Sequence, residues 1–126
     1  MSTSCRFPAG ANQDITLRTG TVDFQTPAYA ATITLTPTQY ITLVQPAQLT
    51  GACTINVGVG SSTTPPYVGD ILKLVLVSDG TSRTVTIGTG AYGTSSTFAV
   101  TTGKYGYLEF VFNGTAWQET ARAITA

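Results

Sequence analysis

The side chains that could carry out acid–base or nucleophilic chemistry are few in this chain. There is no histidine, so neither a Ser–His–Asp nor a Cys–His arrangement has its base. The lysines are Lys73 and Lys104, and neither has the serine motif that a Ser–Lys pair needs. Cys5 and Cys53 stand far apart and do not have the spacing of a zinc site. These residue types predict neither nucleophilic catalysis nor a bound metal.

Paired carboxylates are the remaining route to catalysis, because two acids at a suitable separation hydrolyse glycosidic bonds. Asp79 is expected in an Asp-Gly turn, and Asp70 is expected to cap a loop at the start of a strand. Glu109 and Glu119 are expected on adjacent strands with their side chains on opposite faces, so they should not converge. We therefore expect no catalytic residue, no cofactor and no enzymatic activity.

The charge content sets aside two classes of partner. Only 10% of the residues are charged, and the formal net charge is zero. Without excess positive charge, attraction to nucleic acid or to an anionic membrane is weak. The longest apolar run, Ile71–Val77, is too short for a membrane span and contains Lys73. We expect a protein made in a cytoplasm, with both thiols reduced, although a Cys5–Cys53 disulfide stays open.

Alternating apolar residues predict strands through most of the chain. Residues 1–27 contain several prolines and glycines and only short apolar stretches, so we expect an extended N-terminal arm with at most one short strand. From residue 28 to 126, short segments alternate with period two, and threonine occupies many of the alternate positions. No window has helical periodicity. The prediction is a single all-β domain of about eight strands, a β-sandwich or jelly roll.

Two hairpins are predicted in the second half of the chain. Asp79-Gly80 suits a two-residue turn that places Leu74 opposite Val85. Asn113-Gly114 suits a second turn that places Phe110 opposite Trp117. The residues that these hairpins should bury together are Leu72, Leu74, Val85, Ile87, Leu108, Phe110, Phe112 and Trp117.

The opposite face of the strand at residues 71–78 is also partly apolar, which indicates a covering layer or a subunit contact. Lys73, Val75 and Val77 lie on that face. Exposed tyrosines also favour protein contact, because they give a large contact area at low entropic cost. A sugar platform would need more clustered polar and charged groups than this chain offers. The residues that we expect at an interface are Phe7, Phe24, Tyr67, Tyr105 and Tyr107.

The segments 69–74, 79–90 and 110–122 resemble β-domains of tailed-bacteriophage virion proteins. The pattern F-x-F-(N/D)-G-T-x-W-x-E-x-x-R, read here from Phe110 to Arg122, follows the strand V-T-x-G-x-G at 85–90. This pattern is similar to that of small head decoration (cement) proteins and of head- or tail-fibre modules. The stretch that contains these segments, residues 69–122, covers a little under half of the chain.

The resemblance implies a structural virion protein rather than a catalyst. A decoration protein would bind the major capsid protein on the outside of the head, as a homotrimer, and bridge neighbouring capsid subunits. The arm would add an edge strand to a neighbour or lie across the capsid. A receptor- or glycan-binding fibre module is the alternative.

Overall fold

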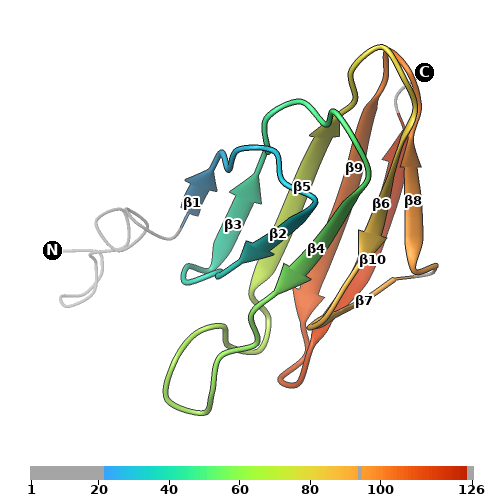
Figure 1. Ribbon diagram of the computed structural model, residues 1–126. Coiled ribbons are helices and arrows are strands. Elements are labelled where there is room, and N and C mark those ends of the chain that lie inside the picture. The colour runs from blue at the N-terminus through green and yellow to red at the C-terminus, as the bar shows by residue number, and fades with distance from the viewer. Residues whose placement is uncertain (1–21, 94, 125–126) are drawn as a thin grey trace, which may run out of the picture.

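The structure, a computed structural model, describes residues 22–93 and 95–124, and these residues form two β-sheets without a helix. The ten strands among them are β1 (Val22–Gln25), β2 (Thr32–Leu35), β3 (Ile41–Val44), β4 (Cys53–Val57), β5 (Ile71–Val77), β6 (Arg83–Ile87), β7 (Ala91–Tyr92), β8 (Thr97–Val100), β9 (Tyr105–Phe112) and β10 (Trp117–Ile124). Figure 1 shows the two sheets packed one behind the other. The all-β prediction is therefore confirmed.

The chain crosses from one sheet to the other after every strand except β9. Sheet A has the order β1-β3-β5-β9-β10-β7, and sheet B has the order β2-β4-β6-β8. Strands β1, β3 and β5 are parallel neighbours in sheet A, and β2, β4 and β6 are parallel neighbours in sheet B. Each early turn of the chain thus adds one strand to both sheets. The count of about eight strands and the jelly-roll arrangement are not confirmed.

The predicted hairpin at Asp79-Gly80 is wrong. Strand β5 lies in sheet A and β6 in sheet B, so the segment at Asp79 crosses between layers. Asp79 still shapes the turn, since its carboxylate accepts hydrogen bonds from the backbone N–H of Thr81 and from the Arg83 side chain. Alternation along a strand is the same whichever strand lies beside it, so Leu74 and Val85 are both buried in the core although they lie in different sheets.

The second predicted hairpin exists, but its register differs. Strands β9 and β10 are antiparallel, and Trp117 lies opposite Phe112 rather than Phe110. The loop is longer than two residues: the Asn113 backbone N–H donates to the Ala116 carbonyl, and its side-chain oxygen accepts from the N–H groups of Thr115 and Ala116. Asparagine therefore organises a four-residue connection, which moves the partner of Trp117 by two residues.

The core lies between the two sheets and is built from their inward-facing residues. The largest of them, Trp117, is fully buried, and its indole N–H donates to the carbonyl of Gly58 at 3.0 Å. Cys53 is buried in the same core, where burial raises the pKa of its thiol. All eight residues expected in the core are buried: Leu72, Leu74, Val85, Ile87, Leu108, Phe110, Phe112 and Trp117.

The last residues of the predicted arm belong to sheet A. Strand β1 pairs along its length with β3. Phe7, Cys5 and the rest of residues 1–21 lie outside the described residues.

Candidate functional site

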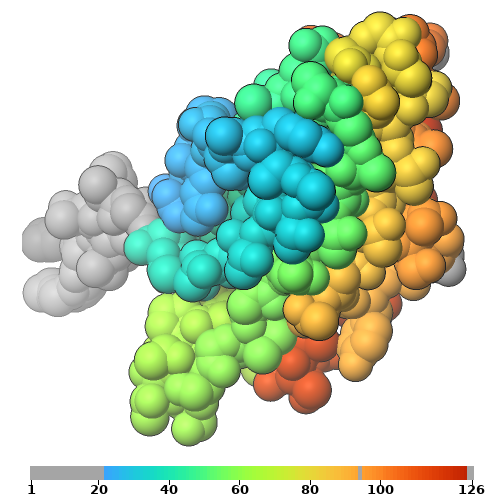
Figure 2. All heavy atoms as spheres, viewed as in Figure 1, coloured from blue at the N-terminus to red at the C-terminus, as the bar shows by residue number. Residues whose placement is uncertain are grey.

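The outer face of sheet B is covered by hydroxyl groups. One row of threonines crosses all four strands, with Thr32 beside Thr54, Thr54 beside Thr86, and Thr86 beside Thr97. Figure 2 views the molecule from this side. Hydroxyl groups on a β-sheet form hydrogen bonds with water without adding charge, so this face is suited to contact with solvent.

The outer face of sheet A is different, because apolar side chains cover most of it. The strands alternate so that their other side chains are buried against sheet B. The residues that form this face, called the A face below, are Val22, Phe24, Ile41, Leu43, Ile71, Lys73, Val75, Val77, Tyr92, Tyr105, Tyr107, Glu109, Val111, Gln118, Ala121 and Ala123. The strands β3 and β5 are thus apolar on both sides. This pattern is typical of parallel strands that are covered on both faces.

The register aligns these residues in rows across the sheet. One row runs from Val22 through Ile41 and Ile71 to Val111, entirely apolar. Exposure varies along this row: Val22 on β1 is 56% exposed, whereas Ile41 on β3 is partly covered by its neighbours. Apolar residues on the A face are therefore contiguous across four strands and not scattered singly.

A small polar cluster occupies the middle of the A face. Lys73 lies directly opposite Glu109 on the neighbouring strand. The Glu109 carboxylate accepts a hydrogen bond from the Tyr107 hydroxyl at 2.6 Å and another from the Thr120 hydroxyl at 3.2 Å. The Tyr107 hydrogen bond holds the pKa of Glu109 below its ordinary value, and Thr120 and the Lys73 charge act in the same direction. The two opposite charges of the A face thus lie on neighbouring strands.

This cluster predicts an unusual tyrosine titration. Burial, and then the Glu109 carboxylate, raise the pKa of Tyr107 to about 12. A raised tyrosine pKa means that the folded state stabilises the neutral phenol. The resulting contribution to the free energy of unfolding is complete below about pH 10 and disappears as the pH rises toward 12. Phenolate absorbance should show a step near pH 12 that is absent from Tyr107→Phe. The same titration curve for both proteins would contradict this contact.

One end of the A face is hollowed. Phe24, Val77 and Tyr105 form one side of a hollow of about 550 Å³, and the loop at residues 45–48 forms the other. Phe24 is 58% exposed and Tyr105 is 52% exposed. The hollow makes this end of the A face concave, which favours binding of a protein surface with a complementary protrusion.

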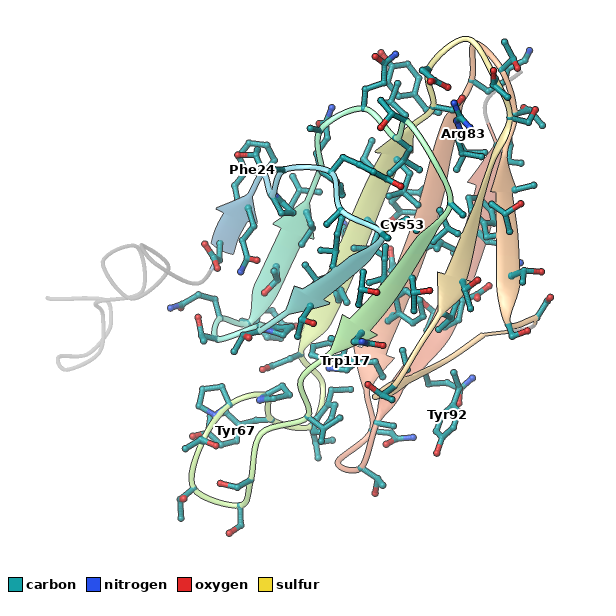
Figure 3. The ribbon with its side chains drawn as sticks, in the orientation of Figure 1. Phe24, Cys53, Tyr67, Arg83, Tyr92 and Trp117 are labelled. Carbon is teal, nitrogen blue, oxygen red and sulfur yellow. The ribbon has the colours of Figure 1, made fainter. Side chains whose placement is uncertain are left out.

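The structure brings three of the five predicted interface residues onto one face. Phe24 from β1 and both Tyr105 and Tyr107 from β9 belong to the A face. Tyr67 lies elsewhere, on the loop between β4 and β5 that projects from the end of the molecule (Figure 3). Sequence reasoning missed Ile41, Leu43 and Ile71 as members of the face. The signal was present in the nearly continuous apolar runs at 41–44 and 71–77.

Tyr67 borders a second hollow of about 440 Å³, which has hydroxyl groups on its rim. Val59 and Val68 also line this hollow, and both are exposed. The Tyr67 backbone N–H donates to the buried carboxylate of Asp70 at 3.0 Å, which anchors the end of the loop. Asp70 therefore has the loop-capping position expected from the sequence.

Acidic side chains do not gather in these hollows. Glu109 lies on the A face, whereas Glu119 turns inward and pairs with Arg122 at 2.7 Å. Within residues 22–93 and 95–124, no group of three or more His, Cys, Asp or Glu side chains is placed to hold a metal ion. In the same part of the chain, no helix is long and apolar enough to cross a membrane.

Comparison with known proteins adds no relative: no family model matches the chain, and no curated protein matches it.

Proposed function

We propose that this protein is a structural virion protein, a decoration or cement protein on the head of a tailed bacteriophage. It is made in the host cytoplasm, acts as a homotrimer, and bridges major capsid subunits on the outer surface of the head. Its ten-strand, two-sheet domain acts as a rigid β-sandwich that binds other proteins. The observation that carries this proposal is the open, apolar A face opposite a hydroxyl-covered sheet B.

The contrast between the two faces supports assembly as the function. Water-exposed apolar patches larger than a few hundred Å² are rare on monomers and mark protein contacts. The parallel strands β1, β3 and β5 have one face covered by sheet B, and the other needs cover as well. The phage-like pattern from Phe110 to Arg122 supports a virion as the setting of that assembly.

A decoration protein works mechanically. Each contact with a capsid subunit stays modest, because an oligomer that touches several subunits at once gains affinity from high effective concentration. Rigidity helps, since less conformational freedom is lost on binding. The strands and their hydrogen bonds supply this rigidity.

The test is to mix the purified full chain with expanded phage capsids that lack their decoration protein. We expect binding at a fixed ratio to the capsid subunits and a higher melting temperature of the capsid. Unexpanded capsids serve as the comparison. Binding to host cells or polysaccharide without any binding to capsids would contradict the proposal.

A receptor- or glycan-binding fibre module is the second candidate, and the hollow beside Tyr67 favours it. Tyr67 is 51% exposed, and hydroxyls of Ser61, Ser62 and Thr115 line the same hollow, as a neutral sugar would require. Tyr67→Ala should abolish host-cell or glycan binding if this function is correct. If the decoration function is correct, the Tyr67→Ala protein is compared with wild type for capsid binding instead.

A further inference from the structure

The A face is too apolar to remain exposed to water until the protein meets a capsid. Interfaces that form and dissociate are about as apolar as ordinary protein surface, whereas permanent ones resemble a domain core. On the A face, the apolar row at Val22, Ile41, Ile71 and Val111 is uninterrupted by charge. A decoration protein is made before it meets the expanded capsid, so a permanently apolar surface needs a partner that is present from the start.

We propose that the A face is covered by the A faces of other copies of this same chain, which makes the protein a homo-oligomer before it binds anything else. This proposal rests on the proposed assembly function and assigns its self-association surface. The hydroxyl face of sheet B and the loops then remain outside, where the capsid is met.

Charge favours a second copy as the occupant. The chain has a formal net charge of zero, so copies do not repel one another. The charged residues of the A face, Lys73 and Glu109, already lie side by side on β5 and β9. Burial between copies therefore buries two opposite charges together, which costs less than burying either charge alone.

The size of the face also fits. Strands lie about 4.8 Å apart and residues along a strand about 3.3 Å apart. With the six strands of sheet A and the seven residues of β5, the flat area is on the order of 500 Å². Two such faces reach about 1,000 Å², the lower limit for a specific interface.

The edge of the sheet is a less suitable contact. On β1, Asp23 lies in register with the buried Thr42 and therefore on the inner side of the sheet, and it accepts a hydrogen bond from Gln25 at 2.8 Å. An inward charge on an edge strand is a common protection against strand addition. We therefore expect copies to join through their A faces rather than through their sheet edges.

The experiment is sedimentation equilibrium of the purified full chain with a matched pair of variants. Wild type should sediment as a multiple of the 13.1 kDa chain at micromolar concentration. Val75→Lys places a charge on the A face and should give a folded single chain by circular dichroism. Thr84→Lys places the same charge on the exposed outer face of sheet B and should leave the oligomer intact. A single-chain wild type, or equal effects of the two variants, would overturn the proposal.

The polar cluster gives an independent readout. Lys73→Met alone and Glu109→Gln alone each leave one charge uncompensated in the interface and should weaken association by about tenfold or more. The double variant removes both charges, retains an acceptor for Tyr107, and should recover most of the association. On an uncovered face these substitutions would have little effect, and that result would also overturn the proposal.

Capsid binding separates the two claims. A wild-type single chain that still binds capsids would overturn the self-association proposal and leave the decoration function standing. An oligomer that depends on the A face but does not bind capsids would support the self-association proposal and contradict the decoration function.

Discussion

Replacing Trp117 by alanine should lower the free energy of unfolding by about 3 to 5 kcal/mol. Trp117 is fully buried, and its ring packs against Phe112 with centroids 5.2 Å apart. Its N–H also joins β10 of sheet A to the crossover after β4 through the Gly58 carbonyl. Alanine leaves a cavity and removes this connection between the layers. Because small domains have only about 5 to 15 kcal/mol of stability, much of the Trp117→Ala protein should be unfolded near body temperature.

Urea denaturation followed by far-ultraviolet circular dichroism measures this effect without using the tryptophan as a probe. Trp117→Phe keeps a ring in the core but loses the N–H, so we expect a smaller loss of about 1 to 3 kcal/mol. Thr84→Ala is the surface control, since Thr84 is exposed on the outer face of sheet B. A loss below about 1 kcal/mol for Trp117→Ala would contradict the position of this side chain in the core.

Replacing Arg122 by methionine should cost about 2 to 3 kcal/mol, more than any other single ion-pair substitution among the described residues. The Arg122 guanidinium pairs with Glu119, whose side chain is only 3% exposed. It also donates to the carbonyls of Ser95 and Thr97 and packs over the Phe98 ring at 5.2 Å. Arg122 thus connects β10 of sheet A with β8 of sheet B, and methionine leaves a nearly buried carboxylate without its cation.

Arg83→Met is the matched control for this prediction. Arg83 pairs with Asp79 at 2.8 Å, but the two side chains are 25% and 27% exposed. Exposed pairs contribute between zero and about 1 kcal/mol, so this variant should change little. Adding Glu119→Gln to Arg122→Met should restore part of the lost stability, because it removes the uncompensated charge. Equal losses for the two arginine variants would show that burial of Glu119 has no energetic consequence.

Alternation along the strands predicted which side chains face the core but not which strands are neighbours. Leu72 and Leu74 point inward whether β6 lies beside β5 or in the opposite sheet. Sequential strands are usually adjacent, which made a hairpin at Asp79-Gly80 the natural expectation. Strand pairing in this protein joins segments that are distant in sequence, such as β5 and β9. The residue pattern of a single strand does not show which strand will pair with it.

The apolar outer face of sheet A was predictable in kind but not in extent. The two-sided apolar character of the 71–77 segment indicated a contact on the outer side of Val75 and Val77. The parallel placement of Ile41 beside Ile71, and of Leu43 beside Lys73, is what widens that strip into a face. Tyr67 was grouped with Tyr105 because both are exposed tyrosines, and only the fold separates them.

Thiol labelling tests most directly whether the A face is covered in the working protein. Tyr105 on the A face and Tyr67 on the loop are 52% and 51% exposed in the single chain. In a Cys5→Ser background, where Cys53 is buried, we would compare Tyr105→Cys with Tyr67→Cys under native conditions with a maleimide. The account predicts that the cysteine at 105 reacts at least about tenfold more slowly, because another copy covers the A face and leaves the loop at residue 67 open. Equal labelling rates would contradict it.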